Sequence, residues 1–267
     1  MALAHVRASA TLAKVQGSLR KISALIHRED AVGVIAQRII ASDGRVVDAV
    51  NRILSAMWLS QDGRTPKLDE AIDVFGWEVV REVAIVAMVH QVNAELAPRA
   101  GIGPLDADRL AIAVLTGAAE LGASPYAALL ANIGSAGLAF LGEERYGQMR
   151  RVPVRTSEDI VEAERITFGF DHGVLAAFML YETDFPDRVC CEVFDHNMPS
   201  SPIWLAEQLA REAGIDAGVP VSANPLARET LLANDYTEGR IERIQKSMLA
   251  AAELPHVVFA SMMHAAA

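Results

Sequence analysis

The chain has 267 residues, of which 52% are hydrophobic, and it carries a net charge of −10. A chain of this length can bury a large core in one or two domains. Its acidity argues against nucleic-acid binding by the body of the protein, because a negative surface repels phosphate backbones.

Composition and pattern both favour helices. Alanine dominates the hydrophobic fraction, and aromatic residues make up only 6% of the chain. Alanine, leucine and the long charged residues are good helix formers, whereas runs of Val, Ile, Thr and Tyr at period two are nearly absent. We therefore expect an all-α protein, a multi-helix bundle in two closely packed halves.

The first 28 residues are basic and carry a net charge of +5, which leaves −15 for the rest of the chain. Leu12, Val15, Leu19 and Ile22 recur at intervals of three and four, which predicts an amphipathic helix over 8–27. Basic residues of this arm that could dock a partner are Arg7, Lys14, Arg20 and Lys21. Two interpretations stay open: the helix packs on the domain, or it docks a partner or an anionic surface.

Turn and capping signals divide the remainder into predicted helices. These helices cover 31–41, 46–58, 68–75, 77–92, 110–121, 125–142, 144–149, 156–168, 170–182, 185–194, 203–213 and 237–254. A Pro- and Gly-rich linker at 98–104 separates two halves of the body, about 29–97 and 105–217. Residues 218–267 are expected to form a C-terminal extension with one long helix.

The stretch 121–142 has no charged residue. It reaches the length of a membrane span, but it contains a proline, an asparagine and four glycines and has no Lys or Arg at its flanks. A helix without a polar face belongs in the middle of a larger helical protein. We therefore expect one central buried helix over 125–142 and no transmembrane segment.

The two cysteines, Cys190 and Cys191, are adjacent. Neighbouring cysteines do not easily bridge each other, so no disulfide framework is expected, which suits a reducing cytoplasm. Apolar Val189 and Val193 flank them and favour a buried structural role over a catalytic Cys–His pair with His196.

Five segments resemble the HDOD domain, the HD-related output domain of bacterial signalling proteins. They are SDGRVVDAVNRILSAMW at 42–58, KLDEAIDVFGW at 67–77, LLANIG at 129–134, EAERITFGFDH at 162–172 and VFDHNMP at 193–199. The segments occur in the order of the family and at roughly its spacing, over about 23–213.

The resemblance also implies what is missing. The HD superfamily performs metal-dependent phosphohydrolysis through an adjacent His and Asp, and the metal activates water. Here Ala131 and Asn132 stand in their place; alanine binds nothing, and a neutral amide is a poor ligand without carboxylates. The resemblance therefore implies a regulatory module with no catalytic residue, no metal and no cofactor.

Two Asp-His dipeptides survive, Asp171-His172 and Asp195-His196. Each Asp could cap a helix while its His packs a loop. Alternatively, the four residues could line a vestigial polar pocket with Asn132 at its floor that binds a small ligand or anion.

We expect a non-enzymatic adaptor of signal transduction in the bacterial cytoplasm that acts through protein–protein contacts. Its partners would be signalling proteins, and homodimerisation is left open. One alternative is a sensing module for a nucleotide-like messenger in the vestigial pocket. Another is a metal-dependent phosphohydrolase with a shifted ligand set.

Overall fold

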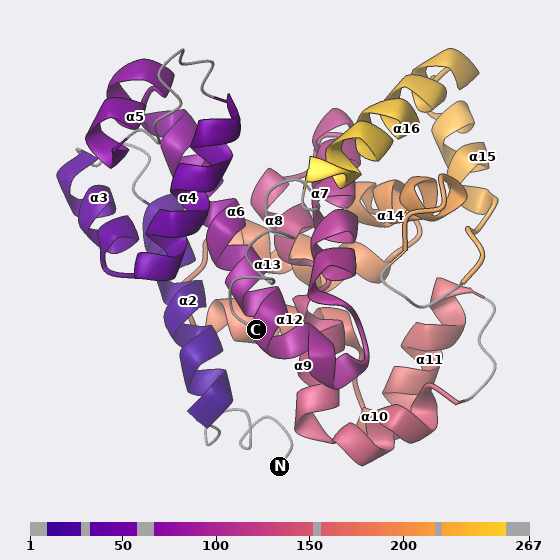
Figure 1. Cartoon of the computed structure of the whole chain (residues 1–267). Coiled ribbons are helices and arrows are strands. Elements are labelled where there is room, and N and C mark those ends of the chain that lie inside the picture. The colour runs from indigo at the N-terminus through magenta and orange to yellow at the C-terminus, as the bar shows by residue number, and fades with distance from the viewer. Residues whose placement is uncertain (1–9, 28–32, 58–66, 152–155, 217–220, 255–267) are drawn as a thin grey trace.

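The computed structural model describes residues 10–27, 33–57, 67–151, 156–216 and 221–254. Helices make up almost all of these ranges, and none of the described residues lies in a strand (Figure 1). The prediction of an all-α protein is confirmed.

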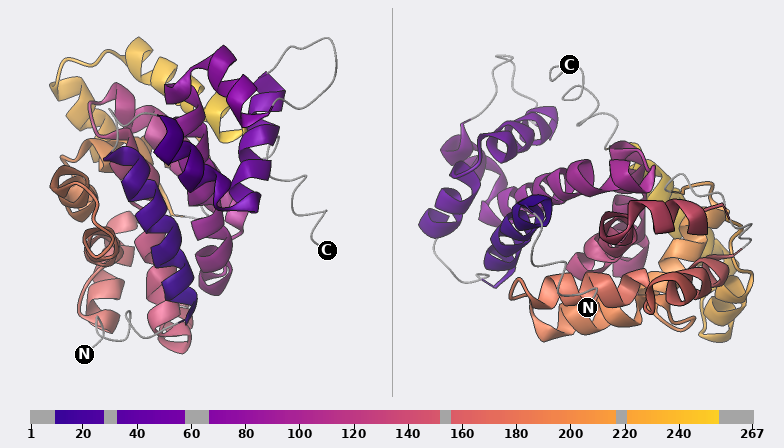
Figure 2. Two further views of the ribbon diagram at one scale, coloured as in Figure 1. Left: turned by 90° about the vertical axis from the view of Figure 1, so that its left-hand side faces the viewer. Right: turned by 90° about the horizontal axis from the view of Figure 1, so that it is seen from below.

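The N-terminal part contains five α-helices. Their bounds are α2 Ala10–Ile26, α3 Gly33–Ala41, α4 Gly44–Met57, α5 Leu68–Phe75 and α6 Trp77–Leu96. Helices α2, α3 and α4 surround one side of α6, and α5 packs against α4 and α6 (Figure 2). The predicted helix 68–75 matches α5, whereas α6 extends four residues beyond its predicted end.

The rest of the chain adds ten α-helices to the described structure. They are α7 Pro104–Glu120, α8 Pro125–Leu130, α9 Ile133–Leu141, α10 Glu143–Met149, α11 Ser157–Phe168, α12 His172–Tyr181, α13 Asp187–Phe194, α14 Pro202–Glu212, α15 Leu226–Ala233 and α16 Glu238–Ala252. Helix α7 lies in the centre, because it packs against α6, α8, α14 and α16. It begins at Pro104, six residues before its predicted start, since proline is well suited to the first turn of a helix.

The predicted linker is mostly structured. Residues Ala97–Ala100 form a 3-10 helix, and the left-handed Gly101 then turns the chain into α7. Ile102 donates a backbone hydrogen bond to the carbonyl of Ala97, which closes this turn. The two halves are therefore joined by a short, ordered connection.

Helix α2 is part of the core. Val15, Leu19, Ile22 and Leu25 are each at most 1% exposed, and the helix packs along α6. The Ser23 hydroxyl donates to the main-chain carbonyl oxygen of Asp184 at 2.5 Å, and His27 Nε2 lies 2.6 Å from the same oxygen. These contacts attach α2 to the turn between α12 and α13.

The stretch 125–142 is not one helix. The chain turns at Ala131 and Asn132, so that α8 and α9 are separate. A side chain at Gly134 would collide with the main-chain carbonyl of His172, so the backbones of α9 and α12 touch at this point. The close approach fixes the position of α9 against α12.

The C-terminal extension holds two helices, where the sequence predicted one. Helix α15 was missed because only Ala227 and Leu231 of its eight residues are buried, which leaves a weak periodic pattern. Helix α16 buries Ile241, Ile244 and Met248 and lies across α7 and α14. Gly117 of α7 makes room for it, since a Cβ there would lie 2.8 Å from Met248 Sδ.

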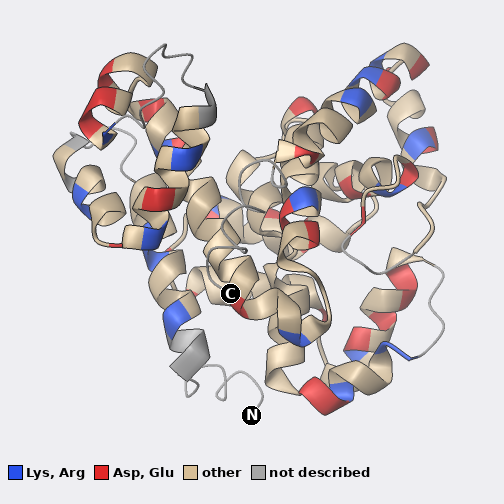
Figure 3. Cartoon of the chain, in the orientation of Figure 1, with Lys and Arg blue, Asp and Glu red and all other residues tan. Residues whose placement is uncertain are grey.

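Charged residues of both signs are mixed along the helices of the surface (Figure 3). Among the described residues no single helix has both the length and the apolar character to cross a membrane. Within the described ranges, one pair, Pro125–Leu141 with Glu143–Met149, meets that test when taken together, and it is bent by 114° at the junction.

Candidate functional site

Six polar side chains from different elements meet in the interior of the second half. We call them the His172 cluster: Asn132, Glu164, Asp171, His172, His196 and Glu207. Asn132 lies at the break between α8 and α9, Glu164 on α11 and Glu207 on α14. His196 lies in the 3-10 helix Asp195–Asn197, directly after α13.

His172 and Glu164 form a buried pair. Glu164 is fully buried, and its Oε2 lies 2.6 Å from His172 Nδ1 and accepts the main-chain N–H of His172 at 2.9 Å. Burial disfavours a charge on His172, but Glu164, with Glu207 and Asp171, outweighs it, so the pKa of His172 is raised. The contact with Glu164 therefore favours the protonated form of His172.

The pKa of His196 is shifted in the opposite direction, downward. It is fully buried, its Nδ1 lies 2.6 Å from the Val193 carbonyl oxygen, and its Nε2 lies 3.1 Å from His172 Nε2. Burial lowers the pKa of His196, and the charge of His172 adds to this effect against the opposing carboxylate of Glu207. The rings meet edge to face, with their centroids 4.9 Å apart.

Asn132 is hydrogen-bonded to an acid. Its Nδ2 donates to Oε1 of Glu207 at 2.8 Å, and Glu207 is 3% exposed. The amide therefore acts as a donor here and satisfies a buried carboxylate.

Asp171 caps the helix that carries His172. Its Oδ1 accepts the main-chain N–H of Val174, and its Oδ2 lies 2.7 Å from the guanidinium of Arg165. Burial raises the pKa of Asp171, but these hydrogen bonds and the charges of Arg165 and His172 together lower it below its usual range. The carboxylate thus fixes the start of α12 and the position of His172.

A glycine allows the two histidines to meet. A Cβ at Gly173 would lie 3.0 Å from Cε1 of His196 and 3.0 Å from Nδ2 of Asn197. Few real Cβ contacts are this short, so a side chain would push the loop after α13 away from α12.

Asp195 does not join the cluster, although its dipeptide matches Asp171-His172 in sequence. Its side chain is exposed, and its main-chain carbonyl accepts a hydrogen bond from Met198. Because Asp195 lies in a 3-10 turn after a helix, and not before one, its carboxylate caps nothing among the described residues. The structure therefore brings together Asn132, Asp171, His172 and His196 of the five predicted pocket residues.

Two acids of the cluster, Glu164 and Glu207, were not predicted as site residues. A visible signal existed for Glu207, since it lies four residues after Ile203 and three before Ala210, on the buried side of its helix. Glu164 similarly lies three residues after Val161, which is also buried. A lone acid on the apolar face of a helix indicates a buried polar contact.

The cysteines differ from each other. Cys190 is buried, and burial, with Asp187 nearby, raises the pKa of its thiol to about 11. Cys191 is exposed, which contradicts the expectation that both are buried.

Two basic residues of the N-terminal segment, Lys14 and Lys21, form ion pairs with acids of the body. Arg7 lies outside the described residues, and Arg20 is exposed. Lys14 Nζ lies 3.8 Å from Glu95, and Lys21 Nζ lies 3.4 Å from Asp43.

A small cavity of about 80 Å³ adjoins the His172 cluster. Glu164 Oε1 is buried beside it with no hydrogen-bond partner among the described residues, and Tyr146 lines the same space. Burial raises the pKa of Tyr146 to about 12, with Glu164 adding to the effect. The volume suits a few water molecules and is far below that of usual small-molecule sites.

The cluster does not fit a metal centre of the HD type. Within the described ranges no three His, Cys, Asp or Glu side chains are grouped to hold a metal ion. Ala131 is fully buried and carries no donor atom, while Asn132 points its N–H group at Glu207. The two histidines face each other and bind Glu164 and Val193 with their remaining nitrogens.

Comparison with known proteins identifies the family of the chain. The family model of the HDOD domain matches residues 12–199, and the chain belongs to the HDOD domain family. The match begins inside α2, so the family segment includes the N-terminal helix. A comparison with curated proteins gives no match.

Solved structures share the fold. An HDOD domain protein with unknown function from Geobacter sulfurreducens is 13% identical, with a TM-score of 0.62, covering 91% of this chain and 90% of its own. A "Putative signal transduction protein" from Marinobacter aquaeolei VT8 is 18% identical, with a TM-score of 0.61, covering 90% of this chain and 58% of its own. A "Putative phosphohydrolase" from Shewanella amazonensis SB2B is 16% identical, with a TM-score of 0.56, covering 90% and 98%.

Proposed function

We propose that the protein is a non-enzymatic adaptor of signal transduction that acts through contacts with other proteins in the bacterial cytoplasm. Membership of the HDOD family and the printed name of the Marinobacter neighbour support a signalling role. The main observation that supports a non-enzymatic role is the replacement of the metal-binding pair by Ala131 and by Asn132 bound to Glu207.

The arrangement of the cluster supports this proposal in a second way. A hydrolytic site needs a polar group that can reach substrate, either directly or through a bound water. His172 and His196 are nearly or fully buried, and both direct their nitrogens at neighbouring protein atoms. In the proposed adaptor these residues hold α9, α11, α12 and α14 together, and partner proteins bind to the surface of the molecule.

The test has two arms. In the first, purified protein is analysed for bound divalent metal and incubated with a generic phosphoester and Mn²⁺ or Mg²⁺. We expect no stoichiometric metal and no hydrolysis above that of the H172Q variant. Hydrolysis that depends on His172 would contradict the proposal.

In the second arm, crosslinking in the native cell captures partners of the full chain. A deletion of residues 1–28 would remove Val15, Leu19 and Ile22 from the core, so single substitutions are the better probe. We expect R20E to weaken capture if α2 contacts the partner, with R188E on α13 as an exposed control of equal charge change. Absence of any specific partner would contradict the adaptor function.

A ligand sensor is the second candidate. The buried, unpartnered Oε1 of Glu164 beside a cavity favours it. The cavity volume of about 80 Å³ does not accommodate a nucleotide, so the vestigial pocket could take only water or a small ion.

A further inference from the structure

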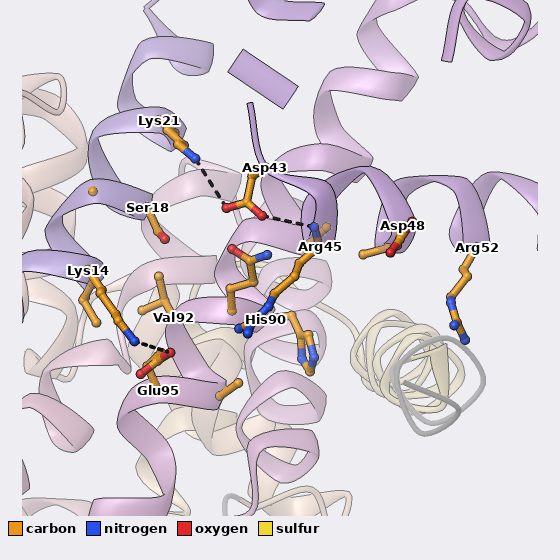
Figure 4. Close-up of a pocket in the computed structure, with 16 residues that line it drawn as sticks. Lys14, Ser18, Lys21, Asp43, Arg45, Asp48, Arg52, His90, Val92 and Glu95 are labelled. Carbon is orange, nitrogen blue, oxygen red and sulfur yellow. Dashed lines mark hydrogen bonds and ion pairs between the residues drawn. The ribbon is translucent and has the colours of Figure 1, made fainter. Parts of the chain in front are cut away.

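A larger pocket of about 790 Å³ lies between α2, α4 and α6, away from the His172 cluster (Figure 4). Sites for small organic molecules usually have volumes of roughly 300 to 1,000 Å³. The pocket therefore has the size of a ligand site, and it lies at the junction of three helices that pack on one another.

The lining has an apolar base and a charged rim. Val15, Ala49, Ala87 and Val92 contribute apolar surface, and each of them is at most 2% exposed. Four cations lie around the pocket: Lys14 and Lys21 on α2, and Arg45 and Arg52 on α4. Three acids accompany them: Asp43, Asp48 and Glu95. The lining thus has one more positive than negative side chain, although the net charge of the whole chain is −10.

The two lysines are held by ion pairs that differ in exposure. Lys14 is 72% exposed and 3.8 Å from Glu95, whereas Lys21 is 33% exposed and 3.4 Å from the half-buried Asp43. An exposed pair contributes little free energy, so an incoming anion can compete with Glu95 for Lys14.

Arg45 is directed toward the pocket. Figure 4 shows its side chain extending from α4 toward α6. Within the described ranges its guanidinium has no ion-pair partner, and only its main-chain N–H binds Asp43. A guanidinium in this position can bind a phosphate or a carboxylate with two hydrogen bonds.

Gln91 lines the pocket and acts on the same acid as Lys21. Its side-chain amide joins Lys21 in lowering the pKa of the Asp43 carboxyl, against the effect of burial. Asp43 is therefore engaged by two groups of the pocket, and it repels an incoming anion less than a carboxylate without partners would.

We propose that the pocket between α2, α4 and α6 binds a small organic anion, in which a phosphate or carboxylate group is attached to an apolar body. The anionic group binds Lys14 and Arg45 from opposite walls. The apolar body covers Val15 and Val92. This site does not depend on the adaptor function, because it uses none of the residues of the His172 cluster.

The experiment is calorimetric titration of the full chain with AMP, which carries a phosphate on an aromatic body. Adenosine lacks the charge, and inorganic phosphate lacks the body. We expect saturable binding of AMP at least about ten-fold tighter than binding of either fragment. If AMP does not bind by about 1 mM, or if adenosine binds equally well, the proposal is wrong.

Matched variants locate the binding. The K14Q/R45Q variant removes one cation from each wall and should weaken AMP binding about ten-fold or more. The R20Q/R38Q variant removes two exposed cations outside the pocket, so it has the same net charge and should bind like the wild type. Equal weakening in both variants would show a non-specific charge effect and overturn the site.

A third variant tests whether AMP occupies the volume of the pocket, and it changes no charge. Gly17 lines the pocket, and a Cβ there would meet no atom within 4 Å. The substitution Gly17→Leu fills this space and also favours the helix, so the protein should fold and lose AMP binding. Unchanged binding in a folded Gly17→Leu variant would place AMP elsewhere.

Discussion

The Nε2 atoms of His172 and His196 lie 3.1 Å apart, so one ring must donate a proton and the other must accept it. The Val193 carbonyl can only accept, so His196 Nδ1 carries a proton. The pKa of His172 is raised and that of His196 is lowered, which favours donation from His172 Nε2 to a neutral His196. Since His172 Nδ1 also faces Glu164, this arrangement places the protonated form of His172 between an acid and a neutral imidazole.

This arrangement predicts a stability maximum in pH. The raised pKa of His172 means that its contribution is complete below about 6.5 and is lost as pH rises through the folded pKa. The lowered pKa of His196 means that its contribution is complete above about 6.5 and is lost as pH falls through the folded pKa. The free energy of unfolding should therefore fall on both sides of about pH 6.5.

Urea denaturation at a series of pH values measures this profile. In the H172Q variant the free energy of unfolding should depend less on pH above about 6.5. In the H196Q variant it should depend less on pH below about 6.5, although Asp171 still contributes there. An alkaline slope that persists unchanged in H172Q would show that another group causes it.

Substitutions at Asn132 distinguish a donor role from a simple filling of space. N132A leaves Glu207 Oε1 without its 2.8 Å donor and should cost about 1 to 3 kcal/mol of unfolding free energy. N132D replaces the donor by a second carboxylate and should cost more than N132A at pH 7. The difference in unfolding free energy between N132A and N132D should become smaller as the pH falls, because the repulsion ends once one of the two acids is protonated. A difference that does not depend on pH would exclude charge repulsion.

The contact between α9 and α12 predicts a strong effect of a single methyl group. Gly134→Ala should cost about 2 kcal/mol or more, because the added Cβ collides with the His172 carbonyl and the backbone must shift. Gly147→Ala on α10 is the control, since a Cβ there meets no atom within 4 Å. It should be neutral or stabilising by up to about 1 kcal/mol in thermal or urea unfolding. Similar losses in both variants would argue against the helix contact.

The C-terminal helix should contribute to global stability. Met248→Ala removes a fully buried side chain between α16 and α7 and should cost about 2 to 5 kcal/mol. Leu249→Ala changes the adjacent residue, which is 43% exposed, and should cost under about 0.5 kcal/mol. A single unfolding transition that shifts only in Met248→Ala would confirm that α16 unfolds with the body. A separate early transition would contradict it.

Most helices could be predicted because their signals are local. Thr156 and Asp159 form a capping box at the start of α11, and Gly169 ends that helix in the left-handed conformation. Such signals involve residues three or four positions apart, so one sequence suffices to read them.

The break at Ala131 and Asn132 could not be predicted, because its causes are distant in sequence. Gly134 meets His172, and Asn132 meets Glu207, on other helices. Apolar periodicity continues across the break, so the pattern alone favours one long helix.

The candidate site could be predicted only in part, because its contacts also join residues that are distant in sequence. Asp171-His172 and Asp195-His196 are identical dipeptides, but only Asp171 lies at a helix N-terminus. The buried acids Glu164 and Glu207 complete the cluster, and their partners become known only when four helices are assembled.

The hydrogen bonds from Ser23 and His27 to Asp184 connect positions 161 and 157 residues apart. Contacts of such long range slow folding, because the intervening chain must be ordered before they form. On the ribosome, α2 cannot reach its acceptor until the turn after α12 has been synthesised. A fragment that ends in the short connection before α7 would therefore lack this attachment, and the two halves are expected to fold together as one cooperative unit.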